Sequence, residues 1–199
     1  MRSVDEPSVT TGSTTRPSDA TPFGTGRADV AGVLLAPGAG GTRDDATLVA
    51  LEAALAPLPV RRVDLPRSAP AAVAAVGRHA ADLAAELGTG TDRLVVGGRS
   101  FGGRMCSMAV AEGLAVAGLV LLSYPLHPPG HPERPRVAHL PAIRVPVLAV
   151  SGERDPFGTS DELAAALGTV SGPTRLVLVP GAHAPTPAPV VAAVLAWLG

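Results

Sequence analysis

A single serine stands between glycines in the segment Gly98-Arg99-Ser100-Phe101-Gly102. An apolar run precedes the segment and a helical pattern follows it, which places the serine on a strand-to-helix turn. Such a turn strains the serine backbone, and neighbours without side chains allow the close approach of helix and strand that exposes the hydroxyl. The segment therefore favours a nucleophilic serine, the alternative being a glycine-rich packing turn in which the serine is incidental.

A serine hydroxyl needs a base, and the base needs a carboxylate that holds it in the correct tautomer. Asp155 follows an apolar run at residues 147–151, and His183 follows another at residues 175–179. If these runs are parallel strands, both side chains lie at the same edge of the sheet as Ser100. The spacing predicts a catalytic set of Ser100, His183 and Asp155.

Other side chains compete for two of these roles. Glu153 competes with Asp155 for the acid, and an aspartate in a turn can also serve only its local backbone N–H groups. His127 follows a strand end, but as the base it would break the order serine, acid, histidine. The remaining histidines lie in a proline-rich loop or in a predicted helix: His131, His139 and His79.

Two backbone N–H groups are predicted to stabilise an oxyanion formed on the substrate. One belongs to Phe101, at the start of the helix after the serine, and the other to Ala39, in the glycine-rich segment 37–41 after the first predicted strand. We expect further substrate contacts from residues around these segments, namely Gly38, Gly40, Arg99, Tyr124 and His127.

The same glycine-rich segment allows a second interpretation, a dinucleotide-binding turn. Gly38-x-Gly40 follows a strand, and Asp64 lies about two dozen residues further on, as in that motif. Arg43 stands where the motif has its third glycine, and a large side chain there would obstruct helix-strand packing. This interpretation also leaves the serine, acid and histidine without a role.

Short Val/Leu runs alternate with Ala-rich helical patterns from residue 31 onward. This alternation predicts an α/β fold: a doubly wound, mostly parallel sheet of about six strands with helices on both faces. The predicted strands are 32–36, 60–63, 94–97, 118–123, 147–151 and 175–179. The predicted helices are 44–56, 69–87, 101–112, 160–167 and 187–198.

One connection, residues 124–144, departs from this rhythm. It contains six prolines and three histidines, which exclude a long helix. We expect a long surface loop that leaves the carboxyl end of a strand and walls the site.

The chain has 199 residues with 16 basic and 17 acidic side chains, a net charge of −1. No strong field therefore draws in nucleic acid or an anionic membrane, and the expected partner is a small molecule. Residues 1–27 are rich in Ser, Thr, Pro and Gly and predict a loose tail before a single domain at 28–199. The single cysteine, Cys106, is expected in the core and fits a cytoplasmic protein, and no segment predicts a membrane span.

These residues together resemble the α/β-hydrolase superfamily. The likeness is narrower to its dienelactone-hydrolase-like branch and to the small Tex/KANL-type hydrolase-like proteins. It rests on the segments 97–104, 123–129 and 150–155 and extends from about residue 31 to residue 198. Because the chain is short, we expect a compact fold without a cap domain. Dienelactone hydrolases use a cysteine nucleophile where this chain has Ser100, so their substrate is not carried over.

The expected function is a serine hydrolase that cleaves a small ester or thioester, with no metal or organic cofactor. The alternatives are a non-catalytic module that binds a partner through the proline-rich loop, and an acyltransferase that uses the same three residues. Arg99 and Arg104 could meet an anionic substrate, but we expect them to form surface or structural ion pairs. The sequence does not predict an oligomeric state.

Overall fold

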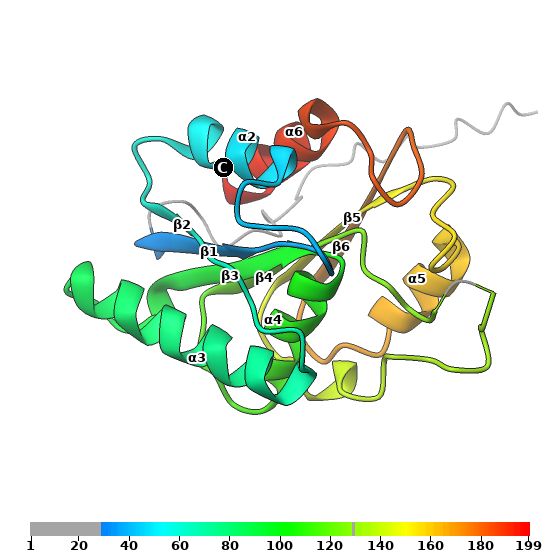
Figure 1. Cartoon of the computed structure of the whole chain (residues 1–199), viewed down its shortest axis with the longest axis horizontal. Coiled ribbons are helices and arrows are strands. Elements are labelled where there is room, and N and C mark those ends of the chain that lie inside the picture. The colour runs from blue at the N-terminus through cyan, green and yellow to red at the C-terminus, as the bar shows by residue number, and fades with distance from the viewer. Residues whose placement is uncertain (1–28, 129) are drawn as a thin grey trace, which may run out of the picture.

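The computed structural model describes residues 29–128 and 130–199 of the chain. The predicted N-terminal tail, residues 1–27, lies outside these residues. The described chain forms one six-stranded sheet in the order β2-β1-β3-β4-β5-β6, and every pair of neighbouring strands is parallel. The predicted α/β fold is confirmed, with a sheet that is parallel throughout (Figure 1).

All six predicted strands are present, and their ends differ from the prediction by at most two residues. The strands are β1 (Gly32–Ala36), β2 (Val60–Arg62), β3 (Leu94–Arg99), β4 (Gly118–Leu122), β5 (Val147–Gly152) and β6 (Thr174–Val179). The largest difference is in β3, which continues past Gly97 to Arg99 because it pairs with β1 and β4 on both sides as far as the turn. Strand β3 therefore ends at the residue before Ser100.

The five predicted helices are also present. They are α2 (Ala46–Leu55), α3 (Ala69–Glu86), α4 (Phe101–Ala111), α5 (Ser160–Leu167) and α6 (Pro187–Leu198). Helix α2 begins two residues later than predicted because the Asp45 side chain caps it, accepting a hydrogen bond from the Thr47 N–H at 2.9 Å. Two short 3₁₀ helices were not predicted, η1 (Thr91–Arg93) and η2 (Leu140–Ala142).

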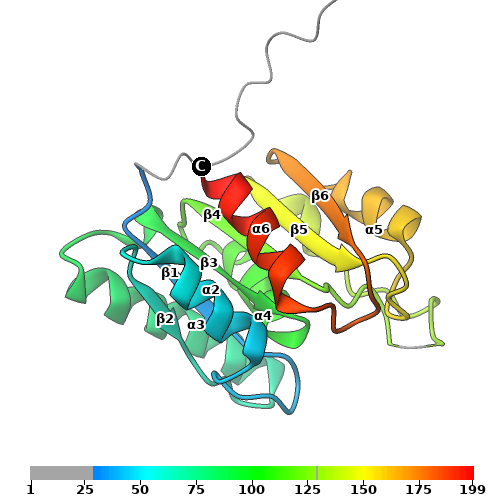
Figure 2. The ribbon, with the colours of Figure 1, turned by 90° about the horizontal axis from the view of Figure 1, so that it is seen from above.

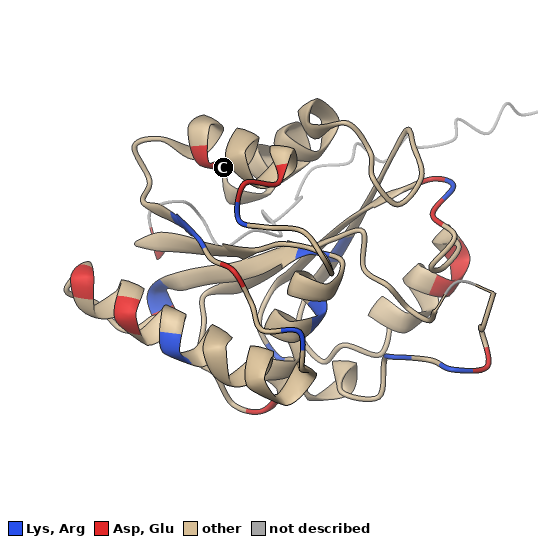
Figure 3. Cartoon of the chain, viewed as in Figure 1, with Lys and Arg blue, Asp and Glu red and all other residues tan. Residues whose placement is uncertain are grey.

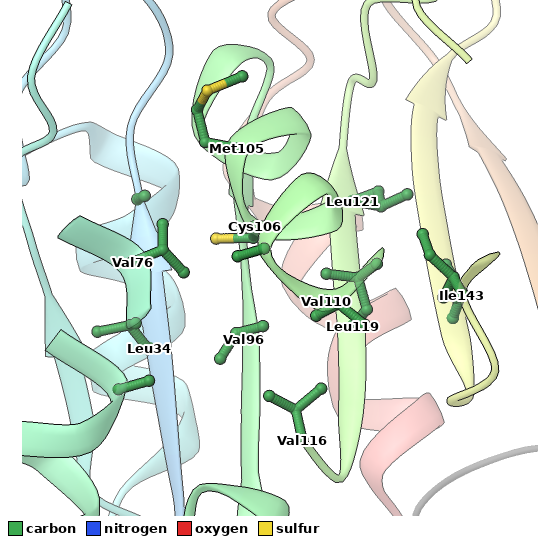
Figure 4. Packing of buried hydrophobic residues seen from close by; sticks show 14 of the residues in the cluster. Leu34, Val76, Val96, Met105, Cys106, Val110, Val116, Leu119, Leu121 and Ile143 are labelled. Carbon is green, nitrogen blue, oxygen red and sulfur yellow. The ribbon is translucent and has the colours of Figure 1, made fainter. Parts of the chain in front are cut away.

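The helices cover both faces of the sheet, as predicted. Helices α2 and α6 lie on one face, and α3, α4 and α5 lie on the other (Figures 1 and 2). Side chains alternate along each strand, so that Leu94 and Val96 of β3 enter one core and Val95 enters the other. Figure 4 shows the first of these cores, where Val96 faces Cys106 and its helix α4.

The strand order places a topological switch point between β1 and β3. These strands are neighbours, but the helices that follow them, α2 and α4, lie on opposite faces of the sheet. The two connections therefore diverge at the carboxyl ends of the strands and leave a crevice between them. The segment 37–41 and Ser100 both lie at this crevice.

The proline-rich connection at residues 124–144 is only partly the surface loop that was predicted. Its tip is exposed around His131, but Tyr124 and Leu126 at one end and Leu140 and Ile143 at the other are buried in the core. Apolar side chains at both ends explain the difference, because their burial holds the loop against α4. The loop is therefore anchored at both ends and can wall the site.

Two further expectations concern the burial of Cys106 and the absence of a membrane span. Cys106 is fully buried, as predicted, and its thiol lies 3.3 Å from the Gly97 carbonyl oxygen. Of the helices in the described residues, none combines the length and the apolar character that crossing a bilayer requires.

Candidate active site

The turn after β3 holds Ser100 in a sparsely populated backbone conformation, with φ of 48° and ψ of −112°. The backbone is held there from both sides: the Ser100 N–H donates to the Leu122 carbonyl at 2.8 Å, and the Ser100 carbonyl accepts from the Arg104 N–H at 3.0 Å. The serine thus occupies the N-cap position of α4, and its side chain caps no helix N–H. The hydroxyl is left available for another partner.

The glycines beside the serine are required by close packing. A Cβ atom at Gly98 or at Gly102 would overlap the carbonyl oxygen of Ala36 on the neighbouring strand. These clashes are with backbone atoms, which cannot rotate away as a side chain can. The prediction that glycines allow helix and strand to approach closely at this turn is therefore confirmed.

Ser100, His183 and Asp155 form a continuous chain of hydrogen bonds. The His183 Nδ1 lies 3.0 Å from Asp155 Oδ1 and 2.9 Å from Oδ2, and its Nε2 lies 2.9 Å from the Ser100 Oγ. A carboxylate only accepts hydrogen bonds, so Nδ1 carries the proton and donates it to Asp155. The Nε2 atom is left as an acceptor for the Ser100 hydroxyl, the arrangement a general base requires.

Asp155 is held in place by further donors. The Phe157 N–H donates to Oδ1 at 2.9 Å, and the Ser151 hydroxyl donates to Oδ2 at 3.3 Å. The Asp155 side chain is 1% exposed, whereas His183 keeps 19% exposure at the cavity. The competing acid, Glu153, is exposed and forms no ion pair within the described residues. Geometry therefore favours Asp155 for the acid role.

His183 is also held by one contact to the face of its ring and another to its backbone carbonyl. The Phe157 ring stacks on it with the centroids 4.0 Å apart and the planes at 29°. The Arg99 guanidinium donates to the His183 carbonyl at 3.3 Å and forms an ion pair with Asp45 at 3.2 Å. Arg99 thus ties the histidine loop to the start of α2, and the predicted structural ion pair is present for this arginine.

A cavity of about 420 Å³ opens beside Ser100. It is lined by Gly38, Ala39, Arg99, Ser100, Phe101, Arg104, Pro125, Arg136, Phe157 and His183. Both N–H groups predicted to stabilise an oxyanion belong to residues of this lining, Ala39 and Phe101. Within the described residues neither donates a hydrogen bond, and Phe101 as the first residue of α4 has no acceptor inside the helix. Both are free to bind an oxyanion.

A second cavity of about 440 Å³ lies on the other side of the glycine-rich segment. It shares Gly38, Ala39 and Phe101 with the first and is bounded also by Gly40 and Leu65. The predicted contact residues Gly38, Gly40 and Arg99 thus line the two cavities.

The predicted substrate contacts Tyr124 and His127 do not line the cavity beside Ser100. Tyr124 is buried, and its hydroxyl donates to the Arg136 carbonyl at 3.0 Å. His127 is turned toward Pro128, with Nδ1 2.8 Å from its carbonyl oxygen. The buried ends of the loop turn both side chains into the protein.

A second serine–histidine pair joins α4 to the proline-rich loop. The buried Ser107 hydroxyl lies 2.8 Å from His139 Nε2 and donates to the Arg104 carbonyl at 2.8 Å. Within the described residues no carboxylate lies within ion-pair distance of His139, and Ser107 is fully buried. Burial, and then the charge of Arg104, lower the pKa of His139 to about 4. This pair is suited to hold the loop on α4.

The structure also shows where the remaining histidines lie and which partner holds Asp64, the acid of the dinucleotide interpretation. His131 lies 3.0 Å from Glu133 at the exposed loop tip, and His79 is half-buried on α3. The Asp64 carboxylate accepts a hydrogen bond from the Arg43 N–H at 2.6 Å and pairs with its side chain. The acid that a ribose would need is therefore already engaged.

Sequence reasoning missed Phe157 and Arg136 as residues of the site. Arg136 lies in a loop whose path depends on burial at its ends, so no local pattern points to it. Arg104 was considered as a contact to an anionic substrate, but an ion pair was expected instead. Its position one helical turn after Ser100 could have shown that it faces the same cavity.

A family model described as an alpha/beta hydrolase domain matches residues 29–187. The chain therefore belongs to the alpha/beta hydrolase family. A comparison of the sequence with curated proteins gave no match.

In residues 29–128 and 130–199, no group of three or more His, Cys, Asp or Glu side chains could hold a metal ion.

Solved structures of the same fold include esterases. The chain is similar to Est1E from Butyrivibrio proteoclasticus, with a TM-score of 0.67 and 18% identity over 83% of this chain and 86% of that one. It is also similar to a carboxylesterase from Mesorhizobium loti, with a TM-score of 0.64 and 22% identity over 83% and 87% of the two chains. For TT1662 from Thermus thermophilus the TM-score is 0.64, with 19% identity over 85% and 90%. At these identities the likeness concerns the fold.

Proposed function

We propose that the protein is a serine hydrolase that cleaves a small ester or thioester through Ser100, His183 and Asp155. The observation that carries the proposal is the hydrogen-bond chain from Asp155 through His183 to the Ser100 hydroxyl, at a strained strand-to-helix turn. A role in packing alone gives no reason to hold a serine at positive φ with its hydroxyl facing a base.

In the first half of the proposed reaction, the Ser100 Oγ attacks the substrate carbonyl and its proton passes to His183 Nε2. The imidazolium that forms is stabilised by Asp155 through Nδ1. The carbonyl oxygen becomes an oxyanion that accepts hydrogen bonds from the N–H groups of Phe101 and Ala39. The tetrahedral intermediate then collapses, the leaving alcohol or thiol takes the proton from Nε2, and an acyl-serine remains.

In the second half, a water molecule enters the cavity and gives a proton to His183 Nε2 as its oxygen attacks the acyl-serine. The same two N–H groups bind the second oxyanion. Collapse breaks the bond to the Ser100 Oγ, which regains its proton from His183, and a carboxylic acid is released. An acyltransferase would differ only in the acceptor, an alcohol or amine in place of water.

The size of the cavities supports a small substrate. The cavity beside Ser100 measures about 420 Å³, within the range of small-molecule sites. Ferulic acid has been observed bound to Est1E, one of the structures of the same fold.

A fluorophosphonate probe tests the proposal directly, since it forms a covalent bond only with an activated serine. We expect the wild-type protein to be labelled, Ser100→Ala to show no labelling, and His183→Ala to be labelled at least 100-fold more slowly. Ser107→Ala is the matched control because Ser107 also contacts a histidine, and it should label like the wild type.

Two results would overturn the proposal. One is the absence of labelling in a folded wild-type sample, which would favour a binding module that acts through the proline-rich loop. The other is labelling that persists in Ser100→Ala and disappears in Ser107→Ala, which would move the nucleophile to the second pair.

A further inference from the structure

The cavity beside Ser100 contains three arginines with different partners. Arg99 is neutralised by Asp45 at 3.2 Å. Arg104 and Arg136 have no carboxylate within 4 Å among the residues that the structure describes. The expectation that Arg104 forms an ion pair is therefore wrong, and two positive charges in this cavity are left without a protein counter-ion.

The two unpaired arginines are partly withdrawn from water. The Nε of Arg104 is buried and has no hydrogen-bond partner, and both side chains are only half-exposed. Burial lowers the pKa of Arg136, and the positive charge of Arg104 lowers it further. Buried donors and like charges held together destabilise a fold unless a ligand satisfies them. The arrangement is thus suited to an anion from outside the chain.

A network of hydrogen bonds holds the backbones of both arginines. The Ser107 hydroxyl donates to the Arg104 carbonyl at 2.8 Å, and the Tyr124 hydroxyl donates to the Arg136 carbonyl at 3.0 Å. Both hydroxyls face the same atom, His139 Nε2, at 2.8 and 3.4 Å. Because the Ser107 hydroxyl uses its proton on the Arg104 carbonyl, the Nε2–H of His139 donates to the Ser107 oxygen, and the Tyr124 oxygen lies at the outer limit of a second contact with the same N–H.

This network fixes the loop that carries Arg136 onto the helix that carries Arg104. Figure 3 shows blue but no red on α4, in agreement with Arg104 as the only charged residue of that helix. The acid of the loop, Glu133, pairs with His131 at the exposed tip, away from the cavity lining. The cavity is therefore positive on the side formed by α4 and the loop.

We propose that Arg104 and Arg136 bind a carboxylate group of the substrate, so that the ester cleaved at Ser100 carries a free carboxylate. The guanidinium group presents paired N–H donors that match a carboxylate. This inference rests on the proposed function, because it assigns the substrate class of the same site. It gives the two arginines a role that neither the fold nor the reaction steps require.

The test compares two esters that differ in one charge. Mono-4-nitrophenyl glutarate carries a free carboxylate, and methyl 4-nitrophenyl glutarate carries a neutral methyl ester in its place. We expect the wild-type kcat/KM to be higher for the anionic ester. The ratio of the two values should fall about tenfold in Arg136→Gln, the usual scale for losing a hydrogen bond between charged groups. Arg104→Gln should lower the same ratio if it folds.

Arg134→Gln is the matched control. Arg134 lies two residues from Arg136 in the same loop, but it is exposed and does not line the cavity. Its removal changes the net charge by the same amount, so its ratio should remain that of the wild type. A wild-type preference for the neutral ester, or an equal ratio in Arg134→Gln and Arg136→Gln, would overturn the inference.

A binding measurement separates this inference from the proposed hydrolysis. In the Ser100→Ala background we expect monomethyl glutarate to bind at least tenfold more tightly than dimethyl glutarate in a calorimetric titration, and Arg136→Gln to remove the difference. If the fluorophosphonate probe fails to label the wild type but this difference is found, the hydrolase proposal fails and the carboxylate site stands. Labelling without any such difference would sink the carboxylate site alone.

Discussion

Each residue of the candidate triad is held by more contacts than the reaction itself uses. Asp155 accepts hydrogen bonds from Phe157 and Ser151 in addition to His183, and the His183 ring stacks on Phe157. These contacts fix the tautomer and the ring orientation of the base before a substrate arrives. Such preorganisation lets small changes at single residues have large effects on the rate.

The first prediction concerns Asp155. In Asp155→Asn the amide can present its N–H₂ group to His183 Nδ1, which favours the tautomer that cannot accept the Ser100 proton. We expect kcat for an ester substrate to fall on the order of 10³ to 10⁴-fold with a much smaller change in KM. Glu153→Gln, two residues away and exposed, should keep the wild-type kcat. A similar loss in both variants would argue against Asp155 as the acid.

The second prediction concerns the strain at Ser100. Glycine adopts a φ of 48° without steric cost, whereas alanine retains the Cβ and the strain. Ser100→Gly should therefore have a free energy of unfolding about 1 kcal/mol higher than Ser100→Ala, with both variants inactive. Urea denaturation of the two proteins measures the difference, and equal stabilities would mean that the serine backbone stores no strain.

At the scale of elements, the junction of β1, β3 and α4 determines whether the serine can be presented. Helix α4 begins against the backbone of Ala36, and glycine is needed at Gly98 and Gly102 for that contact. The helix on the opposite face, α2, is reached from the same end of the sheet. The packing of elements at one edge therefore creates both the turn and the crevice beside it.

The third prediction uses two glycines in different helices. In Gly102→Ala the new methyl group would overlap the Ala36 and Pro37 carbonyls, so we expect a loss of at least about 2 kcal/mol in the free energy of unfolding. Gly77 lies within α3, and a Cβ atom added there would meet no other atom within 4 Å, so Gly77→Ala should instead gain about 0.5–1 kcal/mol from helix propensity. Chemical denaturation distinguishes the two signs, and a neutral Gly102→Ala would show that α4 can move away from β1.

At the scale of the whole molecule, two properties report on the complete fold. The loop at residues 124–144 is attached to α4 through His139, and burial and the charge of Arg104 lower the pKa of this histidine to about 4. The single thiol, Cys106, lies in the core shared by the sheet and α4 (Figure 4). Cys106 is closed to water, and His139 is half-buried, only while sheet, helices and loop remain together.

The fourth prediction is the pH dependence of stability that His139 causes. Its pKa is about 4 in the folded protein against an ordinary value of 6.5, so the unfolded chain binds the proton more readily. The stability that its neutral form contributes is therefore fully present above pH 6.5 and is lost as the pH falls from 6.5 to about 4. Thermal melts across this range should show a shallower decline in His139→Gln than in the wild type.

The matched control for this prediction is His131→Gln, which changes a histidine at the exposed tip of the same loop. Its melting temperature should decline with pH as steeply as that of the wild type. If the slope in His139→Gln equals the slope in His131→Gln, the burial of His139 does not govern the acid sensitivity of the fold.

The fifth prediction concerns Cys106. Burial raises the pKa of its thiol to about 12, and the side chain has no exposed surface. A thiol reagent should therefore leave the native protein unmodified, and labelling in increasing urea should follow the global unfolding transition seen by circular dichroism. Rapid labelling without denaturant would show that α4 opens locally.

The sequence alone determined the order and type of the main elements and the three residues proposed to catalyse. Strands and helices here follow local periodicity. Ser100 directly follows β3, and Asp155 and His183 lie in the loops that leave β5 and β6, so a parallel sheet brings all three to one edge. The tertiary structure decided which polar side chains face the cavity. Arg99 at the end of β3 meets Asp45 at the start of α2. Arg136 is left unpaired and Tyr124 turns inward because burial at the ends of a long loop sets their directions. Such burial depends on residues far apart in the chain, and no local pattern encodes it.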